Sequence, residues 1–250
     1  MIVFLPNIPE ENYRKMEGLS STEICDLAVS SAHWKNAEFK KSGAMELGVH
    51  AHCAILQPEL FKIEDVGACD DRCREWSPAW HAAASKARHQ VLAMRDAVLA
   101  ALPDLFVSDG FDTRDIELTA TNLIDTEQGL LVPIKCRWDL LINRSIAVDL
   151  KTTSARTLAE VYGEIWKWHY PLKAVHYSQV YGVKQYFWVF VSKVAPYGVW
   201  AIEFILSEDN QYYVAAKERW EKAIANYGQY LLSGEQKEPA TGHLFFKENA

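Results

Sequence analysis

Hydrophobic residues recur at helical spacing along much of the chain. The longest such stretch is 79–101, where apolar side chains return every three or four residues before Pro103, and this period indicates a long amphipathic helix. Residues 62–77 are charged and irregular, which is typical of a loop. Further helices are predicted after the hydroxyl residues that precede Glu23, between Ser42 and Pro58, and at about 154–167, 171–183 and 208–232.

The middle of the chain has the alternation of a sheet. Polar and apolar residues alternate from Ile116 to Leu123, as in a half-buried strand. Asn143-Arg144 is typical of a tight hairpin turn between two extended stretches. Strands are predicted at 116–123, 130–142, 145–151, 186–194 and 198–206.

Helical patterns therefore surround strands that come from the middle of the chain. This order predicts one α/β domain over residues 1–250, with a central mixed sheet flanked by helices. We expect an N-terminal helical part at about 18–101 and a second part at about 114–232 that contains the sheet.

Composition places the chain among ordinary globular proteins. Of 250 residues, 49% are hydrophobic and 12% are aromatic, which excludes disorder as the main state. The sequence has no run of about 18 apolar residues, and residues 1–9 lack the basic stretch and apolar run of a signal peptide. The five cysteines are an odd number, and the close pair Cys69 and Cys73 has no second pair to complete a zinc site. We therefore expect reduced thiols and a cytoplasmic protein.

The charge balance narrows the kind of nucleic-acid partner. With 26 basic and 33 acidic residues the formal net charge is −7, which disfavours a protein that coats nucleic acid through bulk positive charge. An enzyme that contacts DNA through a local patch and bound metal ions stays compatible with this number. Positive charge should then lie along the DNA path, near Lys151 and the basic stripe from Lys86 to Arg95.

The predicted hairpin carries the candidate chemistry. Asp139 lies on one strand and Asp149 on its antiparallel neighbour, so the two carboxylates can converge. Lys151 leaves the same face of the strand as Asp149, while Val148 and Leu150 point to the core. Two acids and a lysine on one face suit Mg²⁺, which prefers carboxylate, carbonyl and water oxygens. The alternative is a surface Asp–Lys pair, which is common and contributes little stability.

Asp139 followed, after nine intervening residues, by Asp149-Leu150-Lys151 resembles the PD-(D/E)xK nuclease motif. The surrounding residues resemble the exonuclease VIII-like family of phage and prophage recombination exonucleases. The supporting segments are Gly18-Leu19-Ser20-Ser21 through Ser31-Ala32-His33-Trp34, Ala44-Met45-Glu46-Leu47-Gly48-Val49-His50-Ala51-His52 with Leu56-Gln57-Pro58-Glu59, Asp149-Leu150-Lys151-Thr152-Thr153, and Tyr177-Ser178-Gln179-Val180-Tyr181. The chain departs from the family where Arg137-Trp138-Asp139 replaces Arg-Pro-Asp.

This resemblance implies a restriction-endonuclease-like core and a set of metal ligands. Asp139, Asp149 and the backbone carbonyl of Leu150 would bind the metal, and His52 would be a further ligand or phosphate contact. His50 lies two residues from His52 on a predicted helix, so the two side chains cannot face the same point.

Three more residues have implied roles. Lys151 would position the attacking water and stabilise charge on the scissile phosphate. Gln179 would support the site from the helix after the hairpin, and Glu117 would be an acid of the second coordination sphere.

The implied activity is that of an exonuclease that uses Mg²⁺, or Mn²⁺ in its place, to digest linear double-stranded DNA from an end. The direction would be 5′ to 3′, which leaves single-stranded tails for recombination. The partners would be DNA ends, a single-strand annealing protein and further copies of the chain in a ring, in a bacterial or phage-infected cytoplasm. No membrane and no organic cofactor is expected.

Other functions stay open at this point. One is another nuclease of the same superfamily, either Cas4-like or AddB-like or a restriction endonuclease; the iron–sulfur types need a C-terminal cysteine cluster, and no cysteine follows Cys136. A different class is a catalytically inactive nuclease-fold module that binds DNA or a protein.

The segment Trp166-Lys167-Trp168-His169-Tyr170 has two interpretations. Its aromatic rings could stack on bases, or they could pack at a helix end or a subunit contact. We expect packing, because aromatic residues serve cores and interfaces more often than nucleic acid.

Overall fold

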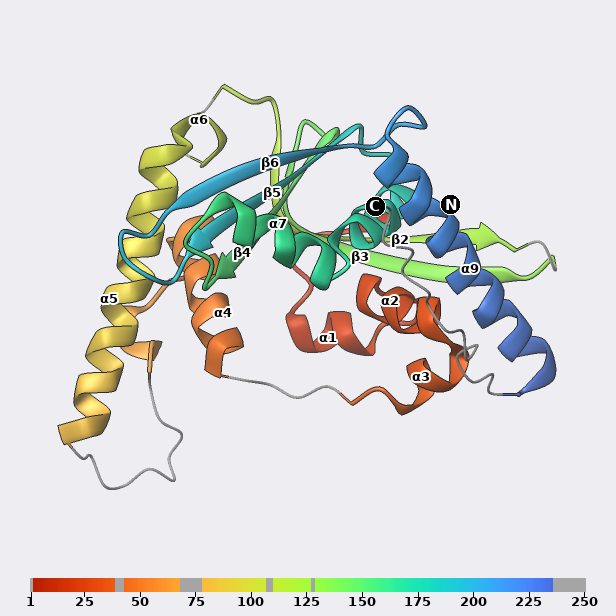
Figure 1. Ribbon diagram of the computed structural model, residues 1–250, viewed down its shortest axis with the longest axis horizontal. Coiled ribbons are helices and arrows are strands. Elements are labelled where there is room, and N and C mark those ends of the chain that lie inside the picture. The colour runs from red at the N-terminus through yellow and green to blue at the C-terminus, as the bar shows by residue number, and fades with distance from the viewer. Residues whose placement is uncertain (1, 39–42, 68–77, 107–109, 127–128, 236–250) are drawn as a thin grey trace, which may run out of the picture.

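A single six-stranded sheet forms the centre of the protein (Figure 1). The computed structural model describes residues 2–38, 43–67, 78–106, 110–126 and 129–235. The strand order follows the sequence; β4 and β5 are parallel, and all other neighbours are antiparallel. The strands are β1 (Val3–Leu5), β2 (Arg114–Asp125), β3 (Leu131–Ile142), β4 (Ile146–Thr153), β5 (Gln185–Ser192) and β6 (Val199–Ile205).

Helices cover both faces of this sheet (Figure 1). One face packs against α4 (Gly43–Leu56), α5 (Pro78–Ala101) and α6 (Pro103–Phe106). The other packs against α2 (Ser21–Val29), α7 (Leu158–Lys167), α8 (Tyr170–Val180) and α9 (Gln211–Ser233). The remaining short elements are α1 (Glu10–Lys15), α3 (Ser31–Asn36) and a 3₁₀ turn, η1 (Ile63–Asp65). The predicted α/β class, with a mixed sheet flanked by helices, is confirmed.

The hairpin that carries the candidate acids is present. Asn143 and Arg144 both have positive φ, 48° and 53°, as the turn between β3 and β4 requires. Val148 and Leu150 point into the core beneath α4 and α5, and both are at most 1% exposed. The alternation along β4 therefore sends Asp149 and Lys151 to the opposite face, as predicted.

The helix beginning near Glu23 is fixed by a capping box. The Ser20 hydroxyl accepts a hydrogen bond from the Glu23 backbone N–H, and the Glu23 carboxylate accepts one from the Ser20 backbone N–H. Ile24 and Leu27 of this helix are fully buried.

The differences from the predictions concern short elements. β1, α1, α3, α6 and η1 are three to six residues long, too short for a period to register. The predicted loop at 62–77 includes η1 and the buried Val66, whose carbonyl accepts a hydrogen bond from Arg88. The rest of that stretch, 68–77, lies outside the described residues, as do Cys69 and Cys73. Among the described helices, none combines the length and the apolar character needed to cross a membrane.

Candidate metal centre

The pleats of β2 and β3 are interrupted at the same level of the sheet. Ile116 pairs with Leu140 and Leu118 with Trp138, but Glu117 and Asp139, which lie between them, are not paired in the ladder. Glu117 has a φ of 50°, which is rare for a residue with a side chain. Leu118 and Trp138 face the α8 side, whereas Leu140 faces the α4 side. Both strands thus exchange faces here, and the two acids lie at the exchange point.

The hairpin strands separate at the same level. β3 and β4 pair only from Leu140–Val148 to the turn, and beyond this the Asp139 carboxylate accepts a hydrogen bond of 2.7 Å from the Leu150 backbone N–H. In an extended strand the N–H and the carbonyl of one residue point to the same side. The Leu150 carbonyl therefore points into the gap beside Asp139; its role as a ligand, which the family resemblance implied, stays a prediction.

Helix α4 brings His52 to this gap. Its Nδ1 atom lies 3.6 Å from a carboxylate oxygen of Asp139. Gly48 lies one turn earlier on the same face of the helix, and a β-carbon there would lie 3.2 Å from the Thr152 hydroxyl. The absence of a side chain at Gly48 thus allows α4 to approach β4 closely. His50, as expected, does not share this face.

Three potential ligand atoms converge in the gap. One atom each from His52, Glu117 and Asp139 lie within 4.8 Å of one another, and all three residues are partly exposed. The resemblance implied a place behind the ligands for Glu117, whereas the structure brings its carboxylate together with Asp139 and His52. Two carboxylates and an imidazole suit a divalent cation, and partial exposure leaves room for water ligands.

Asp149 and Lys151 form an ion pair beside these three residues. The Lys151 ammonium donates a hydrogen bond to the Asp149 carboxylate, which is buried. Burial and the Asp139 charge raise the pKa of Asp149 against the opposing effect of Lys151. Burial lowers the pKa of Lys151, but Asp149 and Asp139 outweigh it and the net shift is upward. Lys151 therefore acts as a cation at this site.

The Glu117 carboxyl group lies between the Asp139 carboxylate and the Arg137 guanidinium. Burial raises the pKa of its carboxyl group, and the Asp139 charge raises it further. The Lys151 charge opposes this rise in the pKa of Glu117. The Nε atom of Arg137 lies 2.9 Å from the Glu117 carboxylate. Arg137 also binds the Glu10 carboxylate and the Ile8 carbonyl, so it connects the site to the N-terminal segment. Sequence reasoning missed this role; the only signal was the position of Arg137 two residues before Asp139.

The helix that follows the hairpin contributes in an unexpected way. The Tyr177 hydroxyl donates a hydrogen bond of 3.0 Å to the Arg137 carbonyl, which fixes α8 to β3 near Asp139. Tyr170, at the start of α8, has its ring centroid 5.8 Å from the Lys151 ammonium. Gln179 accepts a hydrogen bond from Asn122 through its backbone carbonyl. No contact within the described residues joins its side chain to the acids, and its role in the site stays a prediction.

The Trp166–Tyr170 corner combines packing and exposure. Tyr170 is buried as expected, but Trp166 and Trp168 are 48% and 50% exposed. Trp166 lies against Tyr212 of α9, with ring centroids 5.0 Å apart. The expectation of packing therefore holds for Tyr170 and in part for Trp166, whereas half of Trp168 faces solvent.

The mixed sheet with helices on both faces is a fold that this chain shares with a solved structure. A crystal structure from Eubacterium rectale, of a protein called "Putative exonuclease", superposes with a TM-score of 0.60 over 93% of this chain and 90% of that chain, at 14% identity. The predicted restriction-endonuclease-like core agrees with this likeness, which at such identity concerns the fold alone.

A phage related exonuclease from Haemophilus somnus 129PT is also similar, with 12% identity over 90% of this chain and the whole of that chain. That structure superposes with a TM-score of 0.38. The sequence matches no protein-family model and no curated protein.

Proposed function

We propose that this protein is a divalent-metal-dependent nuclease that digests linear double-stranded DNA from an end. The observation that carries the proposal is the convergence of His52, Glu117 and Asp139 in the gap where β3 and β4 separate. The Asp149–Lys151 pair lies beside it. Acids and a protonated lysine in one gap are the groups that phosphodiester hydrolysis needs for metal binding and charge stabilisation.

The residues divide this chemistry among themselves. His52, Glu117 and Asp139 would hold Mg²⁺ or Mn²⁺, with Asp149 and the Leu150 carbonyl as neighbouring ligands. The cation would polarise the phosphate and lower the pKa of a water molecule. Lys151 keeps its proton, so it orients the attacking water and stabilises negative charge on the scissile phosphate rather than removing a proton.

The finer features of the proposal are supported by the resemblance to exonuclease VIII-like enzymes. They are digestion from 5′ to 3′, single-stranded tails for recombination, a single-strand annealing protein as partner, and a ring of identical subunits around DNA.

Digestion of a linear duplex in the presence of Mg²⁺ or Mn²⁺ tests the proposal. Asp139→Asn, Asp149→Asn and Lys151→Ala should each lower the rate by at least about a hundredfold. Asp96→Asn is a matched control, because this carboxylate pairs with Arg95 on the outer face of α5, and it should keep the full rate. Undiminished activity of Lys151→Ala would contradict the site.

The same assay separates the proposal from its alternatives. An exonuclease degrades the linear duplex and spares the closed circular form of the same plasmid. A restriction endonuclease would cut the closed circle, and an inactive DNA-binding module would leave both intact.

A further inference from the structure

A groove opens next to the candidate metal centre. It has a volume of about 360 Å³ and lies between the first half of α4, the end of β4 and the end of α7. This volume falls within the range of small-molecule sites, about 300–1,000 Å³. The residues that matter for its chemistry are Gly48, Thr152, Ser154, Trp168, Tyr170 and Lys193.

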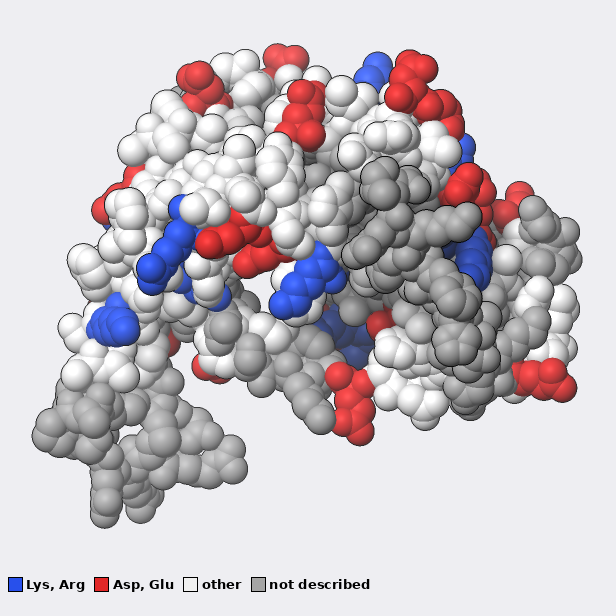
Figure 2. Space-filling model, viewed as in Figure 1, with Lys and Arg blue, Asp and Glu red and all other residues white. Residues whose placement is uncertain are grey.

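The groove is continuous with the proposed site. Thr152 directly follows Lys151 on β4, and the ring of Tyr170 lies between the Lys151 ammonium, at 5.8 Å, and the groove that it lines. Figure 2 shows the viewed face hollowed in the region between α4 and α7 of Figure 1, with Lys or Arg and also Asp or Glu side chains on the rim. A strand whose phosphate lies at Lys151 would therefore place its neighbouring nucleotide in this groove.

The lining of the groove suits a nucleotide. Trp168 is 50% exposed and offers an aromatic face to a base, and the Lys167 ammonium lies 4.9 Å from its ring centroid. The Lys193 side chain makes no ion pair or hydrogen bond with the described residues, so its ammonium can meet a phosphate. The Thr152 and Ser154 hydroxyls add donors. The acid that lines the groove, Glu164, already accepts a hydrogen bond of 2.7 Å from Thr153.

We propose that this groove binds the nucleotide next to the scissile phosphodiester, with its base stacked on Trp168 and its phosphate near Lys193. The inference rests on the proposed function and specifies its substrate contact as a single strand of DNA. The combination of an aromatic face, hydroxyls and ammonium groups is the one by which proteins bind single strands without regard to sequence.

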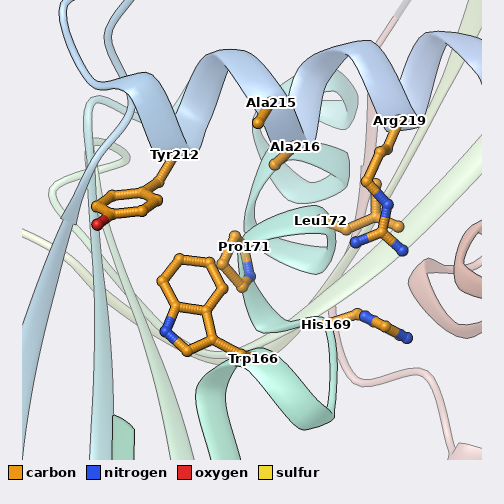
Figure 3. Close-up of a pocket in the computed structure, with 8 residues that line it drawn as sticks. All are labelled: Trp166, His169, Pro171, Leu172, Tyr212, Ala215, Ala216 and Arg219. Atoms are coloured by element: carbon orange, nitrogen blue, oxygen red, sulfur yellow. The ribbon is translucent and has the colours of Figure 1, made fainter. Parts of the chain in front are cut away.

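The neighbouring tryptophan provides a matched control. Trp166 is also half-exposed, but it lines a different and smaller cavity of about 80 Å³ on the α9 side of the same corner (Figure 3). There the Trp166 ring lies beside Pro171 and Tyr212, and Arg219 points toward His169 (Figure 3). If DNA binds in the groove, its affinity should depend on the Trp168 side chain and should not depend on the Trp166 side chain.

The test measures binding of a fluorescent duplex with a single-stranded tail, with Ca²⁺ in place of Mg²⁺ so that binding is read without cleavage. Trp168→Ala should raise the Kd at least about fivefold, the lower limit for loss of one stacked base, and Trp168→Phe should restore most of the affinity. Trp166→Ala should change the Kd less than twofold. On DNA with an abasic site at the nucleotide beside the scissile phosphate, Trp168→Ala should have no further effect.

The outcomes separate the groove from the proposed function. If the wild type digests linear DNA but Trp168→Ala binds as well as Trp166→Ala, the groove assignment is overturned and the nuclease stands. If the wild type digests nothing but the contrast between the two variants persists, the nuclease fails and the groove stands. A wild type that neither digests nor binds DNA overturns both.

Discussion

Glu117 and Asp139 lie opposite each other on β2 and β3, and their partly exposed carboxylates share one gap with the buried Asp149 carboxylate. Like charges at such a site raise the free energy of the folded protein unless a cation compensates them. Arg137 and Lys151 compensate in part, each through one ion pair. A divalent cation would compensate the remaining negative charge. We therefore expect this cluster to lower the stability of the metal-free protein and to bind a divalent cation.

Glu117→Gln tests this expectation. The amide removes one negative charge but keeps the shape, so metal affinity measured by calorimetry should fall at least about tenfold. The melting temperature in the presence of a chelator should not fall, because the substitution also removes repulsion between Glu117 and Asp139. A clear loss of stability without metal would instead show that the ion pair between Glu117 and Arg137 is structural.

At the scale of the element, the distance of helix α4 from β4 depends on the absence of a side chain at Gly48. Gly48 and His52 share a face, and the approach of α4 to Thr152 sets how near His52 comes to Asp139. A helix normally gains up to about 1 kcal/mol when glycine is replaced by alanine.

We expect Gly48→Ala to separate stability from metal binding. The new β-carbon, 3.2 Å from the Thr152 hydroxyl, should move α4 outward by a few tenths of an ångström, so metal affinity should fall while the melting temperature stays level or rises. The double variant Gly48→Ala/Thr152→Ala removes the contact and should recover affinity. Loss of affinity that the second substitution does not relieve would refute this account.

Helix α8 contains a buried histidine that is neutral in the folded state. The Trp220 indole can only donate, so Nδ1 of His176 accepts its hydrogen bond of 3.2 Å, and Nε2–H donates to the Lys135 carbonyl at 2.9 Å. Burial lowers the pKa of His176 to about 4. A proton on this ring would break the contact with Trp220.

The stability of the protein should therefore fall as the pH is lowered from about 6.5 to 4. In this range the unfolded histidine binds a proton that the folded one does not, and the difference amounts to about 3 kcal/mol at full extent. Urea unfolding at several pH values should show this loss in the wild type. In His176→Gln the free energy of unfolding should be lower at pH 7 and vary less with pH; an equal slope in both proteins would contradict the assignment.

The long helices and the hairpin could be predicted from the sequence, but the site could be predicted only in part. Periodicity located α5 and α9, and the turn residues located the β3–β4 hairpin, because these signals are local. The face exchange at Glu117 and Asp139 was not accessible: Ile134, Cys136, Trp138, Leu140 and Ile142 alternate without interruption in the sequence, yet they point into two different cores. Glu117 therefore joins the ligand cluster through a backbone conformation with positive φ, which no residue pattern in the sequence predicts.

For the whole molecule, the net charge of −7 says little about the DNA path. Its acids include the ligand cluster, whose sign a bound cation would reverse locally. The basic stripe on α5 is partly engaged, since Arg88 binds the carbonyls of Glu64 and Val66, and Arg95 pairs with Asp96. Lys151, Lys167 and Lys193, from three separate segments, lie along the proposed path, and the Lys173 ammonium lies 5.4 Å from the ring centroid of Tyr170.

The two edges of the sheet bear on assembly. Within the described ranges, β1 and β6 each have one side without a paired strand, and both carry exposed apolar residues, Val3 and Ile205 among them. Edge strands of this kind favour association, so light scattering should give a mass that is a multiple of the single-chain mass, in line with the proposed ring. A monomer at micromolar concentration would contradict this proposal, and Val3→Lys should weaken the assembly if β1 takes part.

The sequence by itself determined the α/β class, the hairpin, and the placement of Asp149 and Lys151 on one face, because these depend on periods of two and about four residues and on local turn chemistry. Only the tertiary structure decided that Glu117 and His52 meet Asp139, that Arg137 ties the site to the N-terminal segment, and that Trp168 borders a groove beside Lys151. These contacts join residues that lie between 17 positions apart, for Lys151 and Trp168, and 129 positions apart, for Ile8 and Arg137. No local preference of the chain encodes their distance; it follows from how two sheet strands exchange faces and how closely α4 can approach β4.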